Sequence, residues 1–261
     1  MSISVELASF IAVLILAVLH LVAGKLRFLE GIPRSRWLSF ASGSSVAYVF
    51  VRLLPELSAG QDVVGPALGQ VLIFAKNHVY LVALSGLVLF YGVERMVRGS
   101  QKKQGDLQRS KRVERQPDQA GQKGSTTSRG VFWLHSLSFL LYNFLIGYLL
   151  LHRERPGLIP LILFASAMGF HFVVTDFGLR KDQKEMYTRL ARWLLAGALV
   201  SGWLVGLFIS ISKVAVAILV AFLAGGVILN VMKEELPEER ESRFFPFLLG
   251  AAGYAALLLL I

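Results

Sequence analysis

The 261-residue sequence contains no cysteine, and this absence excludes several kinds of chemistry. Without thiols the chain forms no disulfide, holds no thiolate-bound metal and has no cysteine nucleophile. Charged residues are also scarce at 17%, where about 25% is usual for soluble domains. A glycine-rich phosphate loop is missing, which argues against ATP-driven transport. No nucleophile, acid and base come together within the apolar stretches, so we do not expect an enzyme.

What the chain has in abundance is apolar sequence. Hydrophobic residues account for 55% of it, and the mean hydropathy is +0.60. The apolar stretches run for about 20 residues, enough for a helix to cross a ~30 Å hydrocarbon core, and they lack the alternation of barrel strands. The sequence therefore predicts an all-α bundle of eight transmembrane helices in a lipid bilayer, at residues 5–24, 37–56, 78–97, 131–151, 157–177, 190–210, 213–232 and 244–261.

Basic residues are distributed unevenly between the two sides of this bundle. The first, third, fifth and seventh connections hold 22 of the 27 Lys and Arg residues. Because basic residues favour cytoplasmic loops, we expect these connections in the cytoplasm and both termini outside. The net charge of +10 has the same explanation, so we expect no nucleic-acid partner. The first span lacks a basic leader and a cleavage site, so we do not expect a signal peptide.

Residues 98–130 form a long polar stretch rich in Gln, Lys, Arg, Gly and Ser. We expect a flexible cytoplasmic linker here, because the stretch is too polar to fold alone. Its basic run from Arg109 to Arg115 is either solvated or in contact with anionic lipid headgroups. The linker separates helices one to three, in residues 1–97, from helices four to eight, in residues 131–261.

Two segments on opposite sides of this linker resemble each other. Residues 40–57, FASGSSVAYVFVRLLPEL, align with residues 222–239, FLAGGVILNVMKEELPEE. A Phe, a Gly, a Val and a final Leu-Pro-Glu coincide, and we expect the Pro to end each helix. The two segments cross the membrane in opposite directions, which is typical of an inverted repeat in secondary transporters. We therefore expect a 3+2+3 plan with spans four and five in the middle.

With these features the chain resembles the Zrt/Irt-like (ZIP) family of divalent metal transporters. The resemblance rests on the 3+2+3 plan, the long connection after the third span, the two Leu-Pro-Glu ends and Glu94-Arg95 at the end of the third span. It implies a divalent metal ion such as zinc as the transported substrate, and it implies a homodimer. The short chain and the lack of a targeting sequence favour the plasma membrane of a prokaryotic cell.

The resemblance also points to the fourth and fifth spans as the metal site. In the family the fourth span carries a His-Asn-x-Pro-Glu-Gly pattern whose His, Asn and Glu are ligands. Here Tyr142 and Ile146 replace the His and the Glu, while Asn143 remains. In the fifth span His171 remains, but Thr175 stands where the family has Glu. Zinc takes about four N, O or S ligands, so a tightly held two-zinc centre is not expected.

The candidate metal ligands are therefore Asn143, His171, Asp176 and His135. His135, Asp176 and His171 form either a displaced, weaker metal site or a proton path, because ionisable groups inside a membrane are usually functional. The alternative is that His135 and Asp176 are interfacial groups and that His171 is a packing residue. His20 in the first span is either a further ligand or a residue at a helix contact.

Arg52 stands close to the outer mouth of the predicted bundle. It either repels cations there or extends to the outer lipid headgroups. Two functions remain open at this level. The chain is either a carrier for a divalent cation or another small solute, or a non-transporting partner subunit, sensor or scaffold with the same fold.

Overall fold

The computed structural model describes residues 4–23, 35–68, 78–113, 129–153, 156–182, 190–235 and 243–260. Its elements are α1 (Val5–Ala23), α2 (Arg36–Tyr48), η2 (Val49–Leu53), α3 (Leu54–Leu68), α4 (His78–Val113), α5 (Arg129–Leu149), α6 (Leu158–Asp182), α8 (Arg192–Phe208), α9 (Lys213–Asn230), η4 (Val231–Glu235) and α10 (Phe244–Leu259). The segments η2 and η4 are π-helical, with a wider turn than an α-helix. Within these ranges all regular secondary structure is helical, which confirms the predicted all-α class.

Each of the eight predicted spans coincides with a helical segment. Five segments are long and apolar enough to cross a membrane: Val5–Ala23, Arg36–Gly65, His78–Met96, Leu158–Gly178 and Lys213–Lys233. Three shorter apolar helices accompany them: Leu137–Leu149, Arg192–Phe208 and Phe244–Leu259. The structure therefore has the helices of a membrane protein.

The first helix is apolar on its outer side as well as on its buried side. Its buried face includes Val13 and Leu16, each 1% exposed. Its outer face carries large apolar side chains that are 42–56% exposed: Leu7, Phe10, Ile11, Leu14, Ile15 and Val18. A helix that is apolar all round is stable only in a protein core or in lipid. The exposed face of α1 therefore has the composition of a membrane helix.

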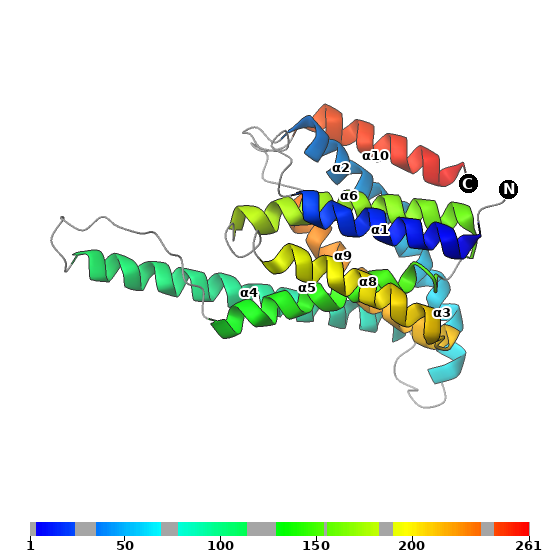
Figure 1. Ribbon diagram of the computed structural model, residues 1–261, viewed down its shortest axis with the longest axis horizontal. Coiled ribbons are helices and arrows are strands. Elements are labelled where there is room, and N and C mark those ends of the chain that lie inside the picture. Colours follow the sequence, from blue (N-terminus) through cyan, green and yellow to red (C-terminus); the bar gives the residue numbers. More distant parts are fainter. Residues whose placement is uncertain are drawn as a thin grey trace.

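The helices run roughly side by side, and the ends of the bundle are distinct (Figure 1). The start of α1 and the end of α10 lie at the same end of the bundle. At the opposite end α4 continues well beyond its neighbours as a projecting helix. Because these two chain ends lie at the same end of the bundle, the chain between them traverses the bundle an even number of times.

The most extensive helix contacts fall into two groups. In the first group α2 packs against α10, α4 packs against α9, and α3 lies against α4 and α9. In the second group α1 packs against α6 and α8, and α5 packs against α8. The main contact between the groups is that of α2 with α6.

Glycines bring the backbones of α2 and α10 together. A Cβ added to Gly43 would lie 2.0 Å from the carbonyl oxygen of Phe247, and one added to Gly250 would lie 2.1 Å from that of Phe40. No side chain fits into such a gap. Small residues at helix contacts are the usual means by which membrane helices approach closely, because lipid supplies no hydrophobic force between them.

The contact between α9 and α4 repeats this arrangement. A Cβ on Gly225 would lie 1.9 Å from the carbonyl oxygen of Ala83, and one on Gly86 would lie 2.3 Å from that of Phe222. The Phe and the Gly that α9 contributes are the ones that align with Phe40 and Gly43 in the sequence. The two aligned segments therefore make the same reciprocal contact, each with a different partner helix.

The π-helical segments also occupy matching positions, because η2 begins at Val49 and η4 begins at Val231, the aligned pair of valines. The expectation that the Pro ends each helix is wrong for Pro55, since the chain continues as α3 to Leu68, and Pro237 lies outside the described residues. Proline clashes with the carbonyl four residues before it in an α-helix. The wider π turn before Pro55, in which the Leu54 N–H bonds to the Val49 carbonyl, relieves that clash.

The predicted linker is partly helical. α4 continues to Val113, so the expectation of a flexible segment is wrong for residues 98–113. Gln, Lys and Arg have good helix propensity, and an existing helix extends more easily than a new one forms. The middle of the linker, residues 114–128, lies outside the described residues.

Glycine-to-alanine substitutions test the close helix contacts. We expect Gly250→Ala and Gly86→Ala to destabilise the protein by about 1–3 kcal/mol each, because the added methyl meets a backbone carbonyl. Gly253→Ala and Gly92→Ala, on the same two helices, are matched controls, since their added Cβ meets nothing within 4 Å. Thermal unfolding in detergent measures the difference. Equal midpoints for a test variant and its control would contradict the packing described.

Candidate functional site

A set of buried polar side chains lies where α1, α5 and α6 meet. They are His20 on α1, Asn143 on α5, and His171, Thr175 and Asp176 on α6. His20, His171 and Asp176 are each 1% exposed, Asn143 is 2% exposed and Thr175 is 7% exposed. Polar groups buried in an apolar bundle are costly unless they are paired. The three helices therefore share a buried polar centre, whose side chains need hydrogen-bond partners within the bundle.

His20 joins the three helices. Its Nδ1 atom lies 2.8 Å from Oδ2 of Asp176, and its Nε2 atom lies 2.8 Å from Oδ1 of Asn143. The ring of Phe172 packs against the imidazole at a centroid distance of 4.3 Å. One side chain from each helix thus contributes to a single hydrogen-bonded junction.

The hydrogen bonds at this junction fix where its protons are. The amide Nδ2 of Asn143 donates to the carbonyl oxygen of Phe139 at 2.9 Å, so its Oδ1 faces His20 and must accept. The Nε2 atom of His20 is therefore protonated. A second proton lies between Nδ1 and the carboxyl group of Asp176, because two bare acceptors would repel each other at 2.8 Å. The His20–Asp176 pair is net neutral in either arrangement of that proton.

Asp176 has one oxygen left over. Its Oδ1 atom is buried and has no hydrogen-bond partner among the described residues. An unsatisfied buried oxygen of this kind costs about 1–3 kcal/mol. Such a cost is common at functional sites, where a ligand or a water molecule supplies the missing partner.

His171 lies on a different side of the junction. Its Nε2 atom is 3.3 Å from Oγ1 of Thr175, one turn further along α6. The ring of Tyr142 packs against it at a centroid distance of 5.7 Å. Tyr142 and Ile146, which replace two ligands of the ZIP pattern, are 2% and 0% exposed and form part of the core.

The predicted metal ligands are thus only partly brought together. Asn143 and Asp176 meet through His20, whereas His171 contacts Thr175 and Tyr142. Among the described residues no group of three His, Asp or Glu side chains is close enough to hold a metal ion. The side chain of His135 lies outside the described residues.

His20 is the residue whose role the sequence did not reveal. A single histidine in an apolar span looks the same whether it is a ligand or a contact residue. Its two partners are 123 and 156 residues away along the chain. The sequence indicated only that His20 should have a polar partner, because an ionisable side chain inside a span needs one.

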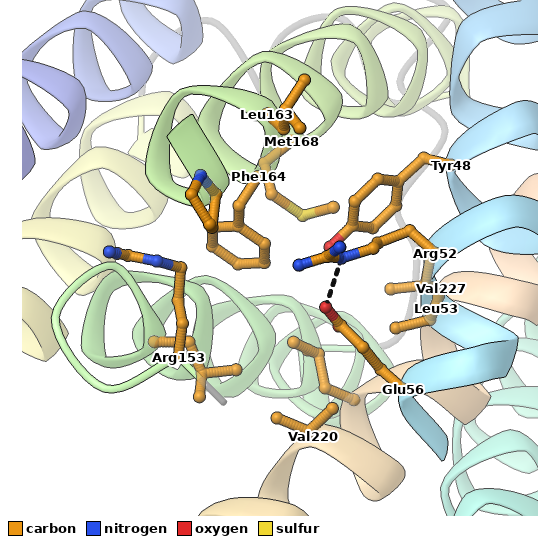
Figure 2. A pocket seen from close by; sticks show the side chains of 13 residues that line it. Tyr48, Arg52, Leu53, Glu56, Arg153, Leu163, Phe164, Met168, Val220 and Val227 are labelled. Atoms are coloured by element: carbon orange, nitrogen blue, oxygen red, sulfur yellow. Dashed lines mark hydrogen bonds and ion pairs between the residues drawn. The ribbon is translucent and has the colours of Figure 1, made fainter. Parts of the chain in front are cut away.

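A pocket lies at another level of the bundle, between η2, the end of α5, α6 and α9 (Figure 2). Its polar lining is Tyr48, Arg52, Glu56 and Arg153. Arg52 is turned into this pocket, where its side chain is 18% exposed and its Nε donates to Oε1 of Glu56 at 2.6 Å. Burial lowers the pKa of the Arg153 guanidinium, while Tyr48 and Glu56 raise it. The group still remains charged at neutral pH.

No known family model matches this chain, and no curated protein matches it. The resemblance to the ZIP family therefore stays a prediction from the motifs quoted above.

A double-mutant cycle tests the junction. We expect His20→Leu or Asp176→Leu alone to destabilise the protein by about 3–5 kcal/mol, because each leaves a buried polar partner unpaired. The double variant should cost much less than the sum, since both partners are then removed. Chemical unfolding of the purified protein in detergent gives the three free energies. Strictly additive costs would mean that the two side chains do not interact.

Proposed function

We propose that this chain is a secondary transporter with a 3+2+3 inverted repeat. The observation that carries the proposal is the reciprocal glycine contact, which α2 makes with α10 and α9 makes with α4. Two sequence-related helices that run in opposite directions and pack in the same way are typical of inverted-repeat carriers. The matched π segments η2 and η4 add independent support.

The wider helix contacts support the same pairing of halves. Suppose that the repeat relates α1 to α8, α2 to α9, α4 to α10 and α5 to α6. The contact of α2 with α10 then corresponds to the contact of α9 with α4. In the same way the contact of α1 with α6 becomes that of α8 with α5. All four contacts are present among the most extensive ones. This pairing leaves α5 and α6 as the central pair.

The buried polar centre supports transport as the role of this architecture. It lies on the central pair, α5 and α6, and on α1. Of these helices, α6 makes the main contact with the other group, through α2. Carriers of this kind hold their solute between the repeats and expose it alternately by rocking one group of helices against the other. The π segments supply local irregularity in two long helices, which such motion needs.

The cargo that the resemblance implies is a divalent metal ion such as zinc, or another small solute. Asp176, His171 and Asn143 supply the oxygen and nitrogen atoms that such a cation prefers. In the described conformation they are not gathered into one ligand set. Binding would therefore require the His20 junction to open. We further propose a homodimer in a plasma membrane.

The second candidate is a non-transporting membrane protein with the same fold, such as a partner subunit, sensor or scaffold. One observation favours it: both ring nitrogens of His20 are engaged within the protein, as is the amide of Asn143. These bonds hold three helices together without any cargo.

Flux into proteoliposomes separates the two candidates. We expect uptake of at least one of zinc, iron, manganese and cadmium by the full-length chain. Asp176→Asn, His171→Ala and Asn143→Ala should each lower it by about tenfold or more, because each removes a donor atom from the polar centre. Ser201→Ala is the control, since this exposed serine bonds only to its own helix. Flat uptake for all four metals would contradict metal transport and favour the second candidate.

The orientation of the chain is tested separately. Because the protein has no cysteine, a single introduced cysteine reports the side of the membrane. We expect Ser4→Cys in intact cells to react with a membrane-impermeant maleimide, and Ser100→Cys to react only after lysis. The reverse pattern would place both termini in the cytoplasm.

A further inference from the structure

The pocket beside η2 has the composition of a binding site rather than of a packing defect. Its walls are apolar, formed by Leu53, Leu149, Pro160, Leu163, Phe164, Met168, Val220, Leu223 and Val227. Arg52 and Glu56 point toward each other in its centre, between Met168 and Val220 (Figure 2). The side chains of Arg52 and Glu56 are only 18% and 17% exposed, so these charged groups are far from bulk water over much of their surface. Charges kept in such a place usually have a function.

Within the part of the chain that the structure describes, the guanidinium of Arg52 is hydrogen-bonded along one edge and not along the other. Its Nε donates to Glu56 at 2.6 Å, which occupies the side of the group nearest the stem. Neither of its two terminal nitrogens has a hydrogen-bond partner among the described residues. The end-on edge of a guanidinium presents two parallel N–H groups, whose spacing matches the two oxygens of a carboxylate.

The charge of the pocket also calls for an anion. Among the described residues its lining contains two arginines, Arg52 and Arg153, and one carboxylate, Glu56, whose formal charges sum to +1. The terminal nitrogens of Arg153 donate to the carbonyl oxygens of Leu150 and Gly157, so this cation is held in place by backbone. One monovalent anion would neutralise the pocket, and neutralisation matters most where the dielectric constant is low.

We propose that this pocket binds a monocarboxylate with an apolar tail. The carboxylate would lie on the terminal edge of Arg52, and the tail would contact the apolar wall that includes Phe164 and Met168. The positive charge disfavours cations here. The site is therefore distinct from the polar centre around His20, and the inference goes beyond the proposed transport of a cation.

Two sources can supply the same ligand chemistry. A short acid such as butyrate would enter from water, and a long-chain fatty acid would enter from the lipid leaflet. Competition distinguishes them, because dodecanoate displaces labelled butyrate only if its longer tail is also accommodated. Displacement assigns the ligand to the lipid source, and its absence assigns it to the aqueous source.

The test is equilibrium binding of labelled butyrate to the purified full-length chain in detergent. We expect saturable binding that weakens about tenfold or more in Arg52→Gln, since the charged bidentate edge is lost. Arg52→Lys should restore binding only in part, because lysine keeps the charge without the two-pronged edge. Lys213→Gln is the matched control, since it removes a basic residue that is exposed and outside the pocket.

A variant that is expected to raise the affinity distinguishes loss of the ligand contact from misfolding. Glu56→Gln removes the competing carboxylate and raises the formal charge of the pocket, so we expect it to bind butyrate several-fold more tightly than the native chain. A misfolded protein would not gain affinity. Absence of saturable butyrate binding, or equal binding by the native chain and Arg52→Gln, would overturn the proposal. Because no flux is measured, this result is independent of the transport test.

Discussion

Helix backbones in this protein come closest where glycine leaves no side chain between them. In lipid there is little hydrophobic drive to bring helices together, so close backbone contact and dispersion must do so. The contacts of α2 with α10 and of α4 with α9 are of this kind, and each uses a glycine from both helices. They form two close helix pairs, which are joined where α3 lies against α9 and where α2 lies against η4. The other group of helices packs against them chiefly through the contact of α6 with α2.

The second group of helices depends on polar chemistry as well as on packing. α5 and α8 also meet through glycines, because a Cβ on Gly147 would lie 2.0 Å from the Leu199 carbonyl and one on Gly202 would lie 1.9 Å from that of Phe144. α1 has few such contacts and is tied instead through the ring of His20. The indole N–H of Trp203 also donates to Ser9. Polar bonds between helices specify one arrangement where apolar contacts would allow several.

Local sequence predicted the helices of this protein well and their contacts poorly. Hydropathy located all eight helical segments. The repeat contained Gly43 and Gly225, which meet carbonyls, but gave no sign of their partners Gly250 and Gly86. Local sequence did not reveal that the helix continues past Pro55, because a π turn depends on the surrounding packing. Nor did it pair His20 with Asp176 or keep Arg52 inside the bundle. Helices that are apolar all round give no signal of their rotation, so partners on different helices cannot be matched from periodicity.

The projecting end of α4 determines how far its basic residues stand from the membrane. It continues in line with the bundle beyond the other helices (Figure 1). At 1.5 Å per residue, the backbone at Arg109 lies about 18 Å beyond the end of the predicted span at residue 97. The Debye length at physiological salt is about 8 Å. On the predicted placement of the span, Arg109 lies beyond the headgroup layer, where salt screens the attraction between the basic residues and the lipid.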